Sequence, residues 1–89
     1  MIAVAPAAVA AAPARSAERA AAMFDAHYDA IWRTLRRLGV PDSSADDAAQ
    51  RVFVVAAQKI DTILGGGEAR YLYGIALRVA SEIRRRDPR

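Results

Sequence analysis

Glycines, tyrosines and arginines gather in the last third of the sequence, and together these residue types can bind nucleic acid. Three consecutive glycines at 65–67 come shortly before Tyr71 and Tyr73, and three consecutive arginines follow at 84–86. Guanidinium groups neutralise phosphates, and aromatic rings stack on exposed bases. An ordinary surface helix explains the pattern equally well, because basic residues also stabilise a helix C-terminus. The pattern alone therefore leaves both interpretations open.

Residues suited to catalysis or metal binding are sparse. The sequence has no cysteine and one histidine, His27, which excludes thiolate and multi-histidine metal sites. His27 has no serine or cysteine nucleophile near it, so we expect a partly exposed polar side chain. Asp46 and Asp47 lack further ligands, and acids early in a helix stabilise its N-terminus. The three glycines lack the Lys-Ser/Thr of a phosphate-binding loop. We therefore expect that the chain is not an enzyme and that it binds neither a metal ion nor a cofactor.

A first helix is predicted from about Ser16 to Leu38. Its apolar residues recur at steps of four and three, which places them on one face: Phe24, Tyr28, Ile31, Leu35 and Leu38. Gly39 stands where a helix C-cap belongs, and Pro41 blocks continuation.

A second helix is predicted to open at residues 42–44 and to end near Leu64. Ser44 and Asp47 have the spacing of a capping box, with Asp in place of the usual Glu. Small and apolar residues recur at helical spacing and form the expected buried face: Ala45, Ala49, Val52, Phe53, Ala56, Ile60 and Ile63.

A third helix is predicted over residues 70–86. One face is apolar, and the other carries Arg70, Arg78 and the arginines at 84–86. No strand pair is visible, so the fold class predicted is all-α, a small three-helix bundle. The shared core is expected to contain Phe24, Tyr28, Ile31, Trp32, Leu35, Val52, Phe53, Ala56, Ile60, Leu72, Ile75, Ala76 and Val79.

Length and charge set further bounds. The chain has 89 residues and a net charge of +3, enough for one small domain. Residues 42–67 carry four aspartates against one arginine and one lysine, a balance of −2, whereas residues 68–89 carry six arginines against three acids, a balance of +3. This asymmetry suggests two surfaces with different partners. The absence of cysteine fits a cytoplasmic location.

The N-terminal stretch is rich in alanine and carries no charged side chain through residue 14. Pro6 and Pro13 interrupt any helix, so we predict a disordered leader at residues 1–15 and a helical domain at residues 16–89. A secretory signal is the rival interpretation, weakened because no basic residue precedes the apolar run. No apolar stretch is long enough to span a bilayer.

Three stretches, in this order and spacing, carry a family resemblance: residues 24–33, residues 46–53, and residues 71–76 with the arginines at 84–86. They resemble region 2 of bacterial RNA polymerase sigma factors, most closely the extracytoplasmic-function group. The resemblance covers about residues 18–87. It implies a helical bundle whose Asp-Asp-x-x-Gln-x-x-Phe helix docks on the clamp helices of the polymerase β′ subunit. The following loop and helix would read the −10 promoter element as a melted non-template strand.

The resemblance also implies roles for individual positions. The polymerase-binding residues would be Asp46, Asp47, Gln50 and Arg51. The DNA-binding residues would be Gly66, Gly67, Glu68, Ala69, Arg70, Tyr71, Arg78, Arg84, Arg85 and Arg86, the first four shaping a pocket for a flipped base. Such a base needs a shaped pocket, and a displaced strand needs positive charge.

Three positions depart from the family pattern. Arg51 stands where an acid is usual, Tyr71 replaces a tryptophan, and Arg78 stands where asparagine is common. The helix-turn-helix domain that usually follows would lie beyond Arg89, so a truncated gene product, an excised domain and a stand-alone domain all remain open. The expected function is a transcription initiation module. The alternative is a protein–protein interaction module, or a decoy that binds polymerase or an anti-sigma factor without productive promoter recognition.

Overall fold

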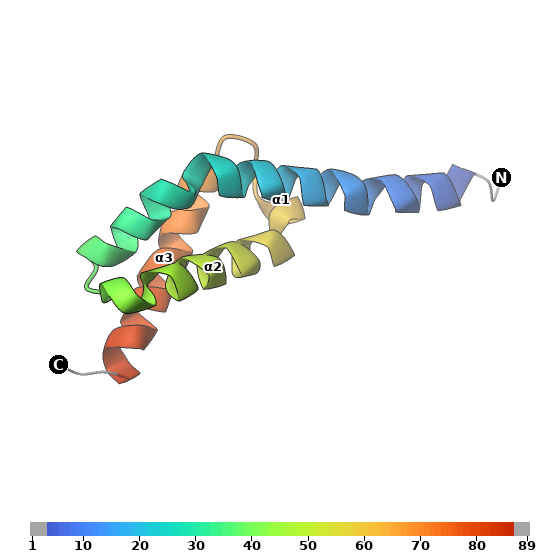
Figure 1. The fold of residues 1–89 in the computed structure, drawn as a ribbon. Coiled ribbons are helices and arrows are strands. Elements are labelled where there is room, and N and C mark those ends of the chain that lie inside the picture. The colour runs from blue at the N-terminus through green and yellow to red at the C-terminus, as the bar shows by residue number, and fades with distance from the viewer. Residues whose placement is uncertain (1–3, 87–89) are drawn as a thin grey trace.

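Three long helices and one short helical turn make up the structure, which is a computed structural model describing residues 4–86 (Figure 1). The elements are α1 (Val4–Arg37), α2 (Asp42–Gln58), the 3₁₀ turn η1 (Ile60–Thr62) and α3 (Glu68–Arg86). No strand occurs within residues 4–86. The predicted all-α, three-helix fold is confirmed.

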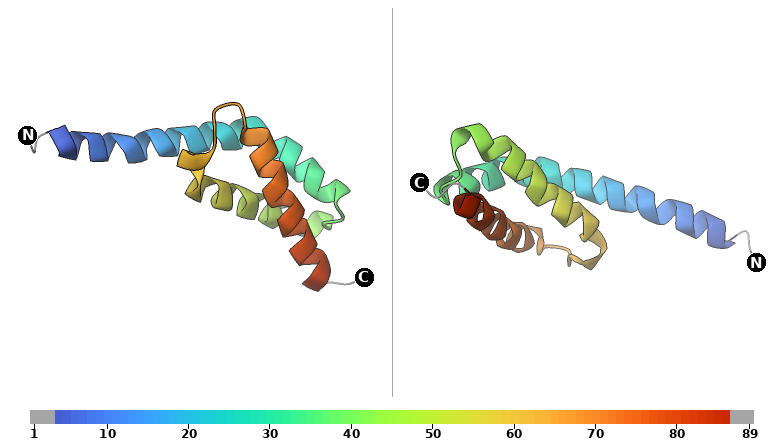
Figure 2. Two further views of the ribbon diagram at one scale, coloured as in Figure 1. Left: turned by 180° about the vertical axis from the view of Figure 1, so that it is seen from behind. Right: turned by 90° about the horizontal axis from the view of Figure 1, so that it is seen from below.

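The first helix begins earlier than the sequence pattern suggests. α1 includes residues 4–15, which were expected to be a disordered leader; residues 1–3 of that leader lie outside the described residues. Alanine dominates this stretch and has the highest helix propensity. Pro6 falls in the first turn, where no helical hydrogen bond needs its missing N–H, whereas Pro13 costs one internal bond. The extension projects beyond the other helices (Figures 1 and 2).

The turn after α1 is a Schellman motif. The Gly39 N–H donates to the Arg36 carbonyl and the Val40 N–H to the Leu35 carbonyl, both at 3.0 Å. Gly39 has a φ of 99°, a conformation that strains any side chain. Leu35 and Val40 are fully buried, which anchors the turn in the core. The prediction of Gly39 as the helix cap is confirmed.

The two ends of α2 differ from the prediction. Pro41 is the N-cap and makes no side-chain cap hydrogen bond. The Ser44 N–H donates to the Pro41 carbonyl at 2.9 Å, so Ser44 already lies inside the first turn. The predicted capping box of Ser44 and Asp47 is therefore wrong. The helix also stops before Leu64, because the chain tightens into η1.

This tightening starts at Lys59, whose N–H bonds the carbonyl of Ala56, three residues back, at 3.0 Å. Such bonds define a 3₁₀ turn, which turns the chain more sharply than an α-helix. Ile60 and Ile63 both stay buried across this change. η1 thus directs the chain from the end of α2 into the glycine loop.

One core lies between the three helices. Its members are Met23, Ile31, Leu35, Val40, Ala45, Ala48, Ala49, Val52, Phe53, Ala56, Ile60, Ile63, Leu72, Ile75, Ala76, Val79 and Ala80. The prediction is wrong for Phe24, which is 39% exposed, while Tyr28 and Trp32 are only half-buried against the core. Met23 takes the inward position beside Phe24. The buried alanines of α2 keep its inward face small, which allows close helix packing.

Candidate nucleic-acid interface

A hollow lies beside the glycine loop that precedes α3. Its volume is about 310 Å³, and its lining is Thr62, Ile63, Leu64, Gly67, Arg70 and Tyr71. Leu64 is 81% exposed, so the hollow has an accessible apolar side chain as well as a cation and an aromatic ring. This combination suits an unstacked base with its phosphate nearby.

The loop adopts its shape through one glycine. Gly66 has a φ of 87°, and no atom would lie within 4 Å of a Cβ added there. The backbone conformation, and not lack of space, therefore requires glycine at this position. The Gly67 N–H donates to the Leu64 carbonyl at 2.9 Å and closes the turn. Of the predicted pocket residues, Gly67 lines the hollow, whereas Gly66 shapes the loop from outside it.

The carboxylate of Glu68 contacts the protein on both oxygens. Oε1 accepts the Gly66 N–H at 3.0 Å, and Oε2 accepts the Arg19 guanidinium at 3.1 Å. The backbone N–H of Glu68 itself, followed by Arg19 and then Gly66, lowers the pKa of this carboxyl group. Glu68 therefore stabilises the loop and is absent from the lining of the hollow. Ala69, the last of the predicted pocket residues, is exposed and also does not line it.

An exposed stripe runs along α3 from the hollow. Arg70, Tyr73, Leu77 and Arg78 are all exposed, with Tyr73 at 49% and Leu77 at 42%. Tyr71, which was predicted to bind DNA, is partly buried against the core. Tyr73 was named with Tyr71 as able to stack on a base but was not among the predicted DNA-binding residues. It is exposed, and its position three residues after Arg70 and four before Leu77 places it on the same helix face.

The arginines predicted to bind DNA fall into two groups. Nη1 of Arg84 donates to the Leu38 carbonyl at 2.5 Å and joins the end of α3 to the turn after α1. Arg70, Arg78, Arg85 and Arg86 make no hydrogen bond or ion pair with any other described residue. These four are therefore available to phosphates, whereas Arg84 has a structural contact.

The outward face of α2 holds the residues predicted to bind polymerase. Asp47, Gln50 and Arg51 line a shallow groove of about 530 Å³, together with Val54, Val55 and Gln58. Asp46 lies outside this lining and accepts a hydrogen bond from the Tyr28 hydroxyl at 2.9 Å. Burial and, after it, this bond raise the pKa of Tyr28.

Arg51 forms an ion pair with Glu82 of α3, with 2.7 Å between Nη2 and Oε1. Both side chains remain partly exposed, at 44% and 35%. The pair partly neutralises the positive charge that Arg51 places on the outward face of α2. Arg51 therefore joins α2 to α3 by a charged contact.

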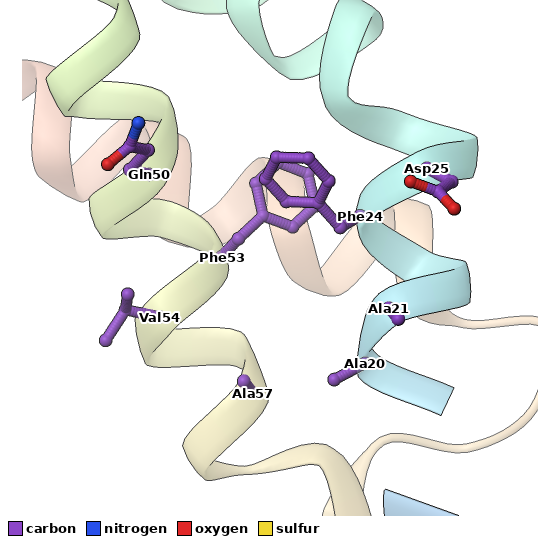
Figure 3. A pocket seen from close by; sticks show the side chains of 8 residues that line it. All are labelled: Ala20, Ala21, Phe24, Asp25, Gln50, Phe53, Val54 and Ala57. Atoms are coloured by element: carbon purple, nitrogen blue, oxygen red, sulfur yellow. The ribbon is translucent and has the colours of Figure 1, made fainter. Parts of the chain in front are cut away.

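A second groove, between α1 and α2, has a volume of about 390 Å³ (Figure 3). Its lining is mostly apolar: Ala20, Ala21, Phe24, Asp25, Gln50, Phe53, Val54 and Ala57. The side chains of Phe24 and Phe53 extend toward each other between the two helices (Figure 3). Gln50 and Val54 border both grooves and connect them. This groove was not predicted from the sequence, because Phe24 was expected to lie in the core.

His27 is half-buried, as expected from the sequence. In the part of the chain that the structure describes, no three His, Cys, Asp or Glu side chains gather into a group able to hold a metal ion. The helices described there are also too short or too polar to cross a membrane. Models of known protein families, curated proteins and solved structures yield no match to this chain.

Proposed function

We propose that this chain is a sigma-factor region 2-like module, which binds core RNA polymerase and the −10 promoter element as a melted non-template strand. Such a module is not an enzyme, needs no cofactor and acts in the cytoplasm. The resemblance of three ordered sequence stretches motivates the proposal. The observation that carries it is the hollow beside the Gly66 turn, which has Arg70 and Tyr71 in its lining.

The hollow and the α3 stripe supply what single-strand recognition requires. A flipped base enters the hollow, where Ile63 and Leu64 offer apolar contact and Tyr71 a ring edge or face. Neighbouring bases stack on Tyr73, and the strand's phosphates follow Arg70, Arg78 and the exposed end of α3. Glycine at 67 leaves the backbone approachable, since no side chain stands in front of it.

The polymerase contact is proposed for α2. Asp47 and Gln50 are exposed beside one groove and present an acceptor and an amide to a partner helix. The adjoining apolar groove at Phe24 and Val54 extends this surface, so polar and apolar contacts are available side by side. This surface lies on α1 and α2, whereas the proposed DNA surface lies on the loop and α3, so the two partners do not compete for the same residues.

An alternative function uses only the surface on α1 and α2. The apolar groove between α1 and α2 leaves Phe24 39% exposed, as expected of a protein–protein contact. A module that binds polymerase or an anti-sigma factor through this groove, without productive promoter recognition, would act as a decoy.

The polymerase contact is tested with the double variant Asp47→Ala/Gln50→Ala. Both side chains are exposed, so the variant should keep its thermal midpoint and lose affinity for immobilised core polymerase. The matched control is Glu18→Ala/Asp29→Ala, which removes two exposed acids of α1 outside both grooves. If the Asp47/Gln50 variant binds polymerase fully and replacement of Arg85 and Arg86 abolishes binding, polymerase binds the end of α3 and the proposed assignment of the two surfaces is wrong.

A further inference from the structure

One side chain of α1 reaches across to the chain segment that forms the hollow. Nη1 of Arg19 donates to the Ile60 carbonyl at 2.9 Å, and Nη2 donates to the Ile63 carbonyl. Nη2 also pairs with the Glu68 carboxylate at 3.1 Å. A single guanidinium therefore connects α1 to the first residue of η1, to the residue that follows η1 and to the first residue of α3.

A second contact supports the same connection. One turn before Arg19, the Ser16 hydroxyl donates to Oδ1 of Asp61 at 2.9 Å. Charge-assisted bonds such as those of Arg19 are stronger than neutral ones and fix geometry, because the guanidinium is planar and rigid. The Arg19 and Glu68 side chains are 35% and 21% exposed, so the pair is partly shielded from water.

Of the residues that Arg19 contacts, Ile63 lines the hollow, whereas Ile60 and Glu68 lie at the two ends of the segment that forms it. Ile63 lines the hollow, and its carbonyl accepts a hydrogen bond from Arg19. Glu68 links Arg19 to the glycine turn, because its other carboxylate oxygen accepts a hydrogen bond from the Gly66 N–H. Gly67, between them, is part of the lining. Arg19 itself does not line the hollow, so its influence must act through the loop backbone.

We infer that Arg19 is a positioning residue that sets the shape of the base-binding hollow and thereby the discrimination between −10 sequences. This inference rests on the proposed function. Arg19 fixes the loop from Ile60 to Glu68 in one conformation before DNA arrives, so little binding energy is spent on ordering it. Loss of Arg19 leaves the phosphate contacts of α3 intact and removes the fixed pocket shape.

The test compares Arg19→Ala and Arg19→Lys with wild type. Lysine keeps the charge but cannot bond two carbonyls and a carboxylate with fixed geometry, so both variants should loosen the loop. The matched control is Arg36→Ala, because Arg36 likewise donates to a backbone carbonyl, that of Val40, at 2.8 Å, but at the other end of α1.

The first readout needs no DNA. Hydrogen exchange at the Gly66 and Gly67 amides should accelerate severalfold in both Arg19 variants, and remain at the wild-type rate in Arg36→Ala. Amides in the middle of α2 and α3 report on the rest of the fold and should not change. An unchanged exchange rate at both glycines in folded Arg19→Lys would overturn the inference, whatever the DNA results.

The second readout is sequence discrimination by protein bound to core polymerase. The probe is a single-stranded oligonucleotide selected from a random pool on the wild-type complex, compared with its single-base variants by fluorescence anisotropy. The ratio of Kd values between variant and selected oligonucleotides should fall severalfold with Arg19→Lys or Arg19→Ala. The salt dependence of binding should stay unchanged, because Arg19 donates to the loop and not to phosphate.

The possible results separate the inference from the proposed function. If the wild-type complex selects no sequence and does not prefer single strand over duplex, the proposed function fails. Hydrogen exchange at the Gly66 and Gly67 amides still tests whether Arg19 positions the loop. If wild type discriminates and the folded Arg19→Lys variant discriminates equally well, the inference fails alone. A flattened salt slope in that variant would also contradict it, since it would show a direct phosphate contact. If Arg19→Ala does not fold, the exchange and discrimination measurements on Arg19→Lys test the inference.

Discussion

The rings of Phe24 on α1 and Phe53 on α2 meet edge to face, with centroids 5.0 Å apart and planes at 61°. Their burial is unequal: Phe53 is 5% exposed and Phe24 is 39% exposed. Phe53 also lies 6.1 Å from the Tyr28 ring. Phe53 therefore belongs to the core, and Phe24 covers it at the edge of an open groove.

The first prediction concerns stability. Phe53→Ala should lower the free energy of unfolding by about 3–5 kcal/mol, because it removes a buried ring and leaves a cavity. Phe24→Ala removes the same number of atoms from a partly exposed position and should cost less than half as much. Urea denaturation of both variants measures the two losses. A loss under about 1 kcal/mol for Phe53→Ala, or equal losses for both, would contradict this placement.

The apolar stripes predicted the helices and most of the core correctly, because burial at a period of 3.6 residues leaves a clear pattern. Phe24 was misplaced because the stripe on α1 is wider than the surface that α2 and α3 cover. The end of α2 was misjudged because Ile60 and Ile63 continue the apolar pattern in a tighter turn. An apolar pattern therefore indicates the inward face of a helix, but neither the width of the surface that covers this face nor the local backbone geometry.

The site was predictable in part. The positions of Gly67, Arg70 and Tyr71 at one loop and helix start follow from their proximity in the sequence. The contact of Arg19 with Glu68, 49 positions apart, has no local signal. Arg84 looked equivalent to Arg85 and Arg86 in a run of three, and only the packing of α3 on the turn after α1 distinguishes it.

The second prediction concerns acid stability. The pKa of Glu68 is lowered from its ordinary 4.5, first by its own backbone N–H and then by Arg19. A lowered carboxyl pKa means that the ionised form stabilises the fold, so this contribution is complete above about pH 4.5 and disappears as the pH falls through the lowered value. Glu68→Gln should therefore weaken the dependence of the urea midpoint on pH below about 4.5. An unchanged pH profile in this variant would show that Glu68 does not contribute.

The third prediction separates the terminal arginines. Arg85→Ala/Arg86→Ala should flatten the log–log salt dependence of single-strand binding by up to about 1.4 units, since each phosphate contact contributes about 0.7. All sequences should weaken alike. The control is Arg84→Ala, which loses the bond to the Leu38 carbonyl and should cost about 1 kcal/mol of stability with a smaller change in slope. A larger slope change for Arg84→Ala than for the double variant would show that the two roles are exchanged.

The most direct test of the DNA-reading role is the relative affinity for single strand and duplex. Protein bound to core polymerase is titrated at low salt, by fluorescence anisotropy, with a −10-type oligonucleotide as a single strand and as the matching duplex. Core polymerase alone, titrated with both forms, provides the baseline. The proposed function predicts a clear preference for the single strand over this baseline, reduced by Tyr73→Ala because stacking contributes about 1–3 kcal/mol per base. Equal affinity for the two forms, with no effect of Tyr73→Ala, would contradict the DNA-reading role and favour the decoy.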